Sequence, residues 1–188
     1  MSYLANAASF LIGLLFSCLI YLFLVRMQLI AVGASFYEPV CQFVYQLTNP
    51  VITPLRRIVP RWGRIELASL LVAYLLVLIE FGASALLFGA AFRLPGVLLT
   101  ALVTLLDRLI WIELVALFVR GLLSWIVSEY RNSNLALLAR FTDPIVRPFR
   151  RLVPPVAGVD FSLAVAMIAL ILARMLIVEP LFALAAHL

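Results

Sequence analysis

The chain has 188 residues, of which 66% are hydrophobic and only 12% are charged, and its mean hydropathy is +1.18. Soluble domains of this length average about half apolar and about a quarter charged residues, so this composition predicts a membrane protein. The net charge of +5 comes from arginine alone, because the sequence contains no lysine. In so apolar a chain, these arginines indicate membrane orientation and lipid headgroup contact before nucleic-acid binding.

Four apolar segments, each long enough to cross a bilayer, follow one another along the chain. About 23 residues of helix span roughly 34 Å, which exceeds the ~30 Å hydrocarbon core of a membrane. No basic residue precedes the first segment and no small-residue cleavage site ends it, so we expect a retained helix and not a secretory signal. The expected spans are residues 3–25, 67–92, 97–120 and 161–182.

The loop between the first two spans predicts two short helices. Apolar residues recur at helical spacing over residues 36–47, and Glu38 followed by Pro39 is a plausible start. In the second helix, Asn49 is the expected N-cap and Pro50 the first helical residue, where a missing N–H is harmless. Asp143 and Pro144 have the same expected roles in the loop before the fourth span. We therefore expect a loop with ordered amphipathic structure.

This second helix belongs to a motif that the chain contains twice. TNPVITPLRRIVP at residues 48–60 recurs as TDPIVRPFRRLVP at residues 142–154, a shift of 94 positions. The same shift superimposes further polar residues: Arg26 on Arg120 and Glu66 on Asp160. A fixed internal period of half the chain length indicates a tandem duplication into residues 1–94 and 95–188.

Each motif copy combines an apolar helical face with an arginine pair on the opposite side. Such a helix fits the membrane–water interface, where its arginines reach anionic headgroups or an acidic partner. The alternative is a loop whose arginines only set the topology. The candidate residues for lipid or partner contact are Asn49, Pro50, Pro54, Arg56 and Arg57, and in the second copy Asp143, Pro144, Pro148, Arg150 and Arg151.

Charged residues also occur near the middle of the apolar segments, at Glu80, Asp107, Arg108 and Arg174, with Glu113 nearby. An unpaired charge at a helix centre costs about 2.5–3.5 kcal/mol on insertion, so we expect the first four to form a neutral intramembrane layer. Glu80 and Arg174 occupy equivalent positions of the two repeats. The layer has two interpretations: an ion or proton path, or structural ion pairs, with Arg174 extending toward the outer surface.

The distribution of arginine predicts the orientation. Arginines concentrate in the two long loops, and Arg93 is the one arginine of the short connection on the opposite side. The positive-inside rule then predicts that both long loops lie in the cytoplasm and both termini lie outside. With two spans in each repeat, both repeats enter the membrane the same way and are related by a pseudo-two-fold axis along its normal.

Enzyme, metal and cofactor signatures are absent from the sequence. It contains no glycine-rich phosphate loop, nucleophile elbow, HExxH or Cys/His cluster. Cys18 and Cys41 form no CxxC, and His187 is the single histidine. We expect no enzymatic activity, no cofactor, no metal and no nucleic-acid partner.

The doubled motif, with residues 63–74 after its first copy and residues 158–162 after its second, resembles the YggT family, which includes YlmG-related proteins. The resemblance covers essentially the whole chain, in the two-repeat, four-span form. It implies an integral protein of the bacterial inner membrane linked to osmotic stress tolerance or cell division, and in plastid relatives to nucleoid or cofactor-assembly roles. It implies no catalytic residues.

The expected fold is therefore an all-α membrane protein of two tandem parallel repeats, each a transmembrane hairpin with an interfacial amphipathic loop. The expected function is a non-enzymatic scaffold or assembly factor that acts through anionic lipid headgroups and a membrane-protein partner or homo-oligomer. The alternative is a small oligomeric ion channel or transporter that uses the buried charge layer.

Overall fold

A computed structural model describes residues 3–35, 37–88, 93–126, 133–152 and 161–188. Within these ranges the chain is helical apart from turns and one isolated β-bridge between Trp62 and Ile65. The elements, in order, are α1 (Tyr3–Ala31), α2 (Pro39–Leu55), α3 (Leu67–Phe88), α4 (Leu94–Ile126), α5 (Ser133–Leu152), α6 (Ser162–Ala173), the π-helical turn η2 (Arg174–Val178) and α7 (Glu179–His187).

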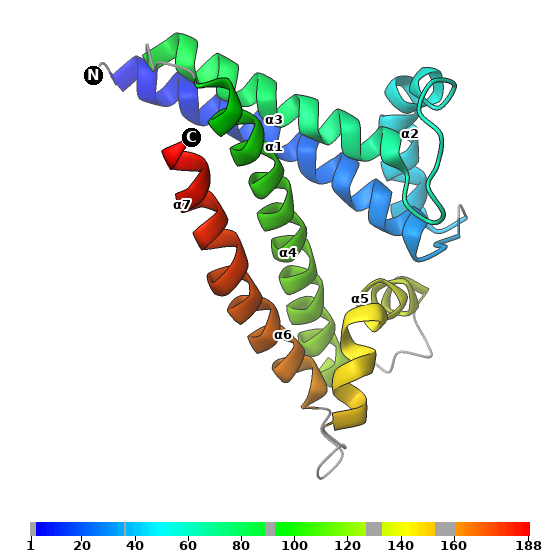
Figure 1. Cartoon of the computed structure of the whole chain (residues 1–188). Helices are drawn as coiled ribbons and strands as arrows, with labels where there is room; N and C mark the ends of the chain where they lie inside the picture. The colour runs from blue at the N-terminus through cyan, green and yellow to red at the C-terminus, as the bar shows by residue number, and fades with distance from the viewer. Residues whose placement is uncertain (1–2, 36, 89–92, 127–132, 153–160) are drawn as a thin grey trace.

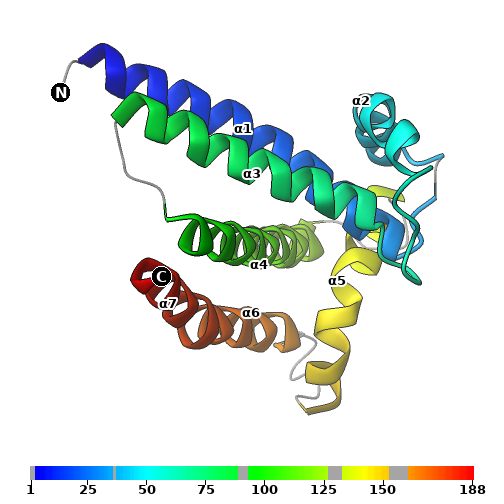
Figure 2. The same ribbon diagram turned by 45° about the horizontal axis from the view of Figure 1, so that its top comes forward.

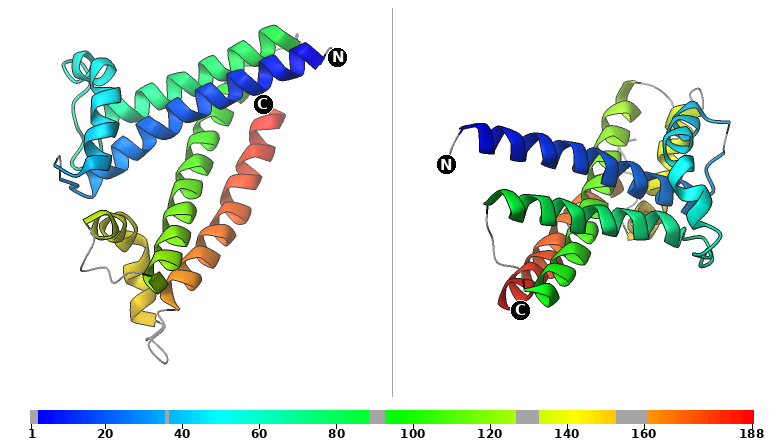
Figure 3. Two further views of the ribbon diagram at one scale, coloured as in Figure 1. Left: turned by 180° about the vertical axis from the view of Figure 1, so that it is seen from behind. Right: turned by 90° about the horizontal axis from the view of Figure 1, so that it is seen from above.

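The long helices form two antiparallel pairs that together make a wedge (Figure 1). Helix α1 packs along α3, and α4 packs along the continuous rod of α6, η2 and α7. The two pairs converge near the chain termini and diverge at the other end, as the view from behind confirms (Figure 3). Helices α2 and α5 lie across these diverging ends (Figure 2).

Three stretches of helix are long and apolar enough to cross a membrane: Asn6–Ala31, Leu67–Leu86 and Ser162–His187. Helix α4 has the length as well, with 33 residues, or roughly 50 Å at 1.5 Å per residue. It differs from the other three by carrying four charged residues between positions 107 and 120. The all-helical, apolar character expected from composition is confirmed.

The first helix is longer than the sequence predicts. We expect a span over residues 3–25, but α1 continues to Ala31, followed by a turn in which Gly33 has a φ of +69°. Glycine adopts this left-handed conformation without strain, which makes it a common stop after a helix. Arg26 therefore lies inside the helix and not at its end.

The loop between α1 and α3 contains one long helix where the sequence predicts two short ones. Helix α2 begins at Pro39 with Glu38 at its N-cap, as expected, but it continues through Pro50 and Pro54. The assignment of Asn49 as an N-cap is therefore wrong. Each internal proline removes a backbone hydrogen bond, and the packing of the inner face compensates. The buried residues of that face are Cys41, Val44, Tyr45, Thr48 and Ile52.

The second motif copy departs from its prediction in the same way. Helix α5 has Pro144 and Pro148 in its interior, so Asp143 is not an N-cap either. Its buried residues in this region include Thr142 and Val146, the equivalents of Thr48 and Ile52. The same inward packing holds both motif helices together across their prolines.

The last helix also extends further than predicted. The expected span ends near residue 182, close to Glu179 and Pro180, whereas helical structure continues to His187. The turn before Glu179 is π-helical, and the Glu179 N–H donates to the Arg174 carbonyl. This widened turn places Pro180 in the first turn of α7, a position at which the absence of a backbone N–H costs no hydrogen bond within that helix.

Close backbone packing holds the start of α4 against the end of α7. A β-carbon added at Gly96 would lie 2.8 Å from the carbonyl oxygen of Ala185. Glycine is therefore the one residue that fits here without a shift of backbone.

Besides a smaller cluster that packs Val146 of α5 against Leu117 and Ala166, two hydrophobic clusters stabilise the arrangement around the motif helices. One lies mainly within the first repeat and includes Ile20, Leu24, Ile52 and Val77. The other joins the two repeats, because it brings residues of α1 and α2 against residues of α4 and α5. Its buried members are Leu29, Ala34, Cys41, Val44, Tyr45, Ala116, Leu137 and Phe141.

Candidate functional site

A single buried arginine connects three segments of the first repeat. The Nε of Arg26 donates to Oε2 of Glu66 at 2.8 Å, and its Nη1 donates to Thr48 Oγ1 at 2.5 Å and to Asn49 Oδ1 at 2.9 Å. The guanidinium carbon also lies 5.0 Å from the centroid of the Tyr45 ring. Arg26 thus ties α1 to the motif on α2 and to the residue preceding α3.

The carboxylate of Glu66 is surrounded by donors. Its Oε1 accepts from Arg56 Nε at 2.6 Å, and its Oε2 accepts from the Ser69 hydroxyl as well as from Arg26. Burial raises the pKa of Glu66, but the hydrogen bonds from Arg26, Ser69 and Arg56 outweigh it and hold the pKa below its usual value. Glu66 is therefore ionised at neutral pH. We call Arg26, Thr48, Asn49, Arg56, Glu66 and Ser69 the first arginine cluster.

The second repeat builds the same arrangement around Arg120. Its Nη1 donates to Thr142 Oγ1 at 2.7 Å and to Asp143 Oδ1 at 2.9 Å, and also to the Ala139 carbonyl at 3.3 Å. Arg150 lies 3.9 Å from the same Asp143 oxygen. We call Arg120, Thr142, Asp143 and Arg150 the second arginine cluster. Asp160, the sequence equivalent of Glu66, lies outside the described residues.

The motif threonines have the same role in both clusters. Each hydroxyl accepts from the buried arginine and donates to a carbonyl four residues earlier, Thr48 to Val44 at 2.5 Å and Thr142 to Leu138 at 2.9 Å. Both threonines are fully buried. This pairing fixes the hydroxyl orientation and presents a lone pair to the arginine.

The structure separates the two members of each motif arginine pair. Arg56 and Arg150 turn toward the carboxylates of the clusters. Arg57 and Arg151 are exposed, and neither forms an ion pair with another described residue. The four prolines among the candidate residues, at 50, 54, 144 and 148, are exposed as well. Asn49 and Asp143, both candidates for lipid or partner contact, accept hydrogen bonds from the buried arginines.

Helix α2 carries a second apolar face that the protein does not cover. Large apolar side chains stand exposed at spacings of three to four residues along it, which places them on one side of the helix. They are Val40, Phe43, Leu47 and Val51.

The four charges expected within the membrane form two separate ion pairs. Arg108 Nη2 lies 2.9 Å from Glu80 Oε2, which joins α3 to α4. Arg174 Nε lies 2.7 Å from Asp107 Oδ1, which joins α4 to η2. Glu80 therefore pairs with Arg108 and not with Arg174.

Aromatic rings accompany both pairs. Arg108 lies over Tyr21 at 5.8 Å and Arg174 over Trp111 at 5.6 Å, each measured from the guanidinium carbon to the ring centroid. Arg174 also contacts Glu179, with 3.5 Å between Nη1 and Oε1. The Arg174 side chain is thus held by two carboxylates, whereas the structural interpretation expects it to extend toward the outer surface.

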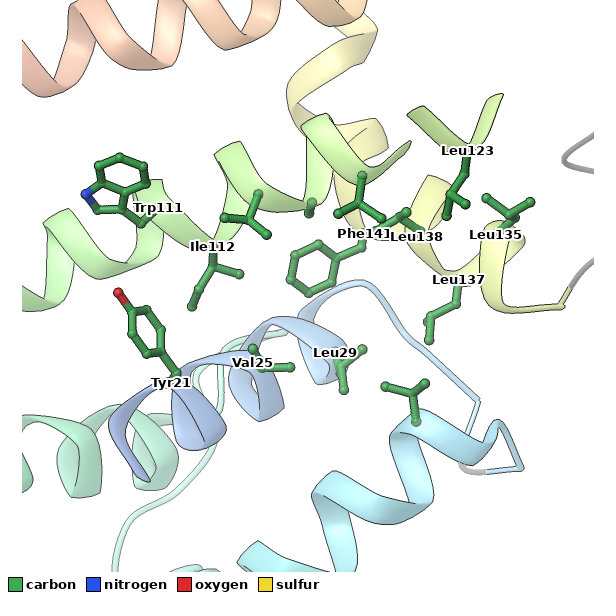
Figure 4. A pocket seen from close by; sticks show the side chains of 14 residues that line it. Tyr21, Val25, Leu29, Trp111, Ile112, Leu123, Leu135, Leu137, Leu138 and Phe141 are labelled. Atoms are coloured by element: carbon green, nitrogen blue, oxygen red, sulfur yellow. The ribbon is translucent and has the colours of Figure 1, made fainter. Parts of the chain in front are cut away.

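An apolar cavity of about 830 Å³ lies between the two helix pairs on the side of α2 and α5. Side chains of α1, α4 and α5 face the same space, and the Tyr21 hydroxyl points toward Trp111 (Figure 4). Tyr21 and Trp111 are the two lining residues with polar side-chain atoms. The volume is in the range of ligand pockets, about 300–1,000 Å³, but such pockets usually add several convergent polar groups.

The buried arginines and threonines are the part of the site that the sequence does not predict. The shift of 94 residues superimposes Arg26 on Arg120 and Thr48 on Thr142, yet nothing in either residue type indicates that they contact one another. The usable signal is the repeat itself, because polar residues shared by both halves of an apolar chain are candidates for a shared buried contact.

A duplicated, all-helical chain with three helices that are apolar and long enough to span a bilayer is compatible with a multi-pass membrane protein. The family model described as CCB3/YggT matches residues 5–87 and, again, residues 99–181. The two matches begin 99 − 5 = 94 positions apart, which equals the shift between the motif copies. The chain belongs to the CCB3/YggT family.

The sequence is similar to those of individual relatives over nearly their whole length. The chain is 38% identical over 178 residues to the "Uncharacterized protein in proC 3'region" of Vibrio alginolyticus, covering 91% of this chain and 93% of the relative. It is 35% identical over 176 residues to the "Uncharacterized protein YggT" of Escherichia coli K12, covering 94% and 92%. An uncharacterised protein of Pseudomonas aeruginosa is 32% identical over 182 residues, covering 96% and 92%. No solved structure matches the chain.

Proposed function

We propose that the chain is a non-enzymatic inner-membrane scaffold or assembly factor, which acts through lipid headgroups and a protein partner at the surface formed by α2, α5 and the exposed motif arginines. The observation that carries the proposal is that the two arginines of each motif pair have different surroundings. One arginine of each pair is used inside a cluster, while Arg57 and Arg151 are exposed without an ion pair among the described residues. A role in osmotic stress tolerance or cell division stays a prediction from the family.

In the proposed membrane arrangement, α1, α3, α4 and the rod from α6 to α7 are four spans, and each repeat is a hairpin. Helices α2 and α5 would then lie at the cytoplasmic surface, with both termini outside. Contacts between the motif helices support a position of both helices on the same side of the membrane, since Arg140 of α5 lies 3.8 Å from Glu38 at the start of α2. Leu137 and Phe141 of α5 also belong to the cluster that contains Cys41 of α2.

The exposed apolar face of α2 supports a position in the membrane interface. Its four large side chains would enter the acyl boundary, while the inner face stays packed against the protein. Arg57 follows this helix and would reach the headgroups, where each basic residue contributes about 1 kcal/mol near an anionic leaflet. The arginine cluster would hold α2 in this orientation.

The paired intramembrane charges favour a scaffold over the alternative of a small oligomeric channel or transporter. A conducting path needs its charged groups to face water, whereas Glu80 and Asp107 each lie within 2.9 Å of an arginine. Such pairs fix the register of neighbouring helices without transport. Ion flux through reconstituted protein, compared with Glu80→Gln, tests the alternative: flux that depends on Glu80 would favour it.

Crosslinking in native membranes tests the scaffold proposal. The double variant Arg57→Gln with Arg151→Gln removes the exposed charges and leaves both clusters intact. The matched control is Arg93→Gln, an exposed arginine near the opposite end of the helices. Because arginines set orientation, the topology of each variant is confirmed first. We expect a stoichiometric partner that is lost in the double variant and retained in the control. Self-crosslinks alone, unchanged in the double variant, would contradict the proposal.

A further inference from the structure

One acidic residue inside the helix pairs has no basic partner among the described residues. Glu113 of α4 is largely enclosed, and the one hydrogen bond that it forms within the described part of the chain comes from Gln28 Nε2 of α1, 3.0 Å from Glu113 Oε1. The two remaining side-chain oxygens, Gln28 Oε1 and Glu113 Oε2, are both buried and have no hydrogen-bond partner. The contact joins α1 of the first repeat to α4 of the second.

The other intramembrane acids differ from Glu113 because each faces an arginine, Glu80 facing Arg108 and Asp107 facing Arg174. None of the described charged or titratable groups on α4 or on the elements packed against it forms an ion pair or hydrogen bond with Glu113. These groups are Asp107, Arg108 and Arg120 of α4; Tyr3, Cys18, Tyr21 and Arg26 of α1; Tyr74 and Glu80 of α3; Arg140, Asp143, Arg147, Arg150 and Arg151 of α5; Arg174 of η2; and Glu179 and His187 of α7.

We propose that Glu113 is a proton-binding site within the membrane and that Gln28 holds it there as the neutral carboxylic acid. An ionised carboxylate offers acceptors only, so it leaves both buried oxygens unsatisfied and adds an unpaired charge in an apolar setting. One proton removes the charge and converts Glu113 Oε2 into a donor. Gln28 Oε1, which lacks a donor, is the acceptor that matches this new donor. A neutral carboxylic acid and a side-chain amide each carry a donor and an acceptor, so each can satisfy the other.

The surroundings of Glu113 favour the neutral form. Its neighbours Ile112 and Ala116 line the apolar cavity, which supplies no charged side chain. The pair is also specific to one interface, since the shift of 94 residues places leucine at both equivalent positions, Leu19 (113 − 94) and Leu122 (28 + 94). The site is therefore not part of the architecture common to both repeats. Loss of the proton would weaken the contact between the two repeats.

Infrared difference spectroscopy of the full-length protein in liposomes tests the proposal. The spectrum of wild type minus Glu113→Gln at neutral pH isolates the group that the substitution removes. We expect a carbonyl band of a protonated carboxylic acid that is lost in the variant, and that converts to carboxylate bands as the pH is raised. Loss of carboxylate bands at neutral pH would overturn the proposal. Glu80→Gln is the matched control and should lose carboxylate bands, because Glu80 faces Arg108.

The variant Gln28→Met keeps the acid and tests its partner. Without the amide, the Glu113 carbonyl no longer accepts a hydrogen bond, so its band should shift to higher frequency. An unshifted band would overturn the assignment of Gln28 as the group that holds the acid. This readout does not depend on the folding of the Glu113 variant.

Discussion

Arg26 and Glu66 form a buried ion pair, with 2.8 Å between Nε and Oε2, although they lie 40 positions apart in the chain. Each side chain is 1% exposed. Because Arg26 lies in the C-terminal part of α1 and Glu66 directly precedes α3, the pair joins the interior of one helix to the start of the helix packed against it. The intervening helix α2 is held at the same point through Thr48 and Asn49.

Breaking this pair from one side should be strongly destabilising. Arg26→Gln leaves Glu66 with one cation fewer, and removal of one partner of a buried pair typically costs about 3–5 kcal/mol. The double variant Arg26→Met with Glu66→Met removes both charges, and its loss should be smaller than the sum of the two single losses. Unfolding of the purified protein in detergent micelles measures each value. Strictly additive losses would contradict the pairing, and Arg57→Gln, an exposed neighbour of the cluster, is the control that should unfold like wild type.

The ion pairs of Glu80 and Asp107 lead to a second prediction, about which residues interact energetically. Glu80 and Arg108 should show a coupling energy of about 0.5–3 kcal/mol in a double-mutant cycle, since they are in direct contact. Glu80 and Arg174, which occupy equivalent repeat positions, should show none, because Arg174 pairs with Asp107. Both cycles use glutamine substitutions and unfolding in micelles. Coupling between Glu80 and Arg174 that exceeds the coupling to Arg108 would reverse this assignment.

Much of the architecture could be predicted because it follows from local pattern. Helical periodicity and Pro39 locate the start of α2, and the motif shift of 94 residues identifies the duplication. The family matches, offset by the same 94 positions, support the duplication. The expected positions of Glu80 and Arg108 near the middle of their segments agree with their 2.9 Å contact, because antiparallel helices place such positions at a similar level.

The remaining features depend on tertiary contacts that no local rule describes. Asn49 before Pro50 resembles a helix start, and it fails as one because Arg26 binds Asn49 and Thr48 from outside the helix. The sequence also does not indicate which of Arg56 and Arg57 contacts the buried carboxylate. Arg56 reaches Glu66 only because the turn after α2 folds back toward the start of α3, where Gly63 adopts a φ of +58°.

Acid should weaken the first arginine cluster through Glu66. Its folded-state pKa lies below the ordinary value of 4.5, so the ionised form contributes stability that is present above the unfolded-state pKa. That contribution is lost as the pH falls through the lower, folded-state pKa. Stability measured in micelles should therefore fall below about pH 4.5 in wild type. Glu66→Gln should be less stable at neutral pH and show a shallower acid dependence; an identical slope in both proteins would exclude Glu66 as the titrating group.

Two glycines offer a matched test of how tightly the ends of the second repeat pack. At Gly96 an added β-carbon would meet the Ala185 carbonyl at 2.8 Å, and because that atom belongs to the backbone, α7 must shift. Gly96→Ala should therefore destabilise by about 1–3 kcal/mol, as other overpacking changes do. At Gly82 nothing lies within 4 Å, so Gly82→Ala should be neutral or stabilise by up to about 1 kcal/mol through helix propensity. The free energy of unfolding in micelles is measured for both variants. A loss for Gly96→Ala without a loss for Gly82→Ala would establish the α4–α7 contact. Equal effects would place α7 away from α4, because alanine has the same intrinsic preference in both helices.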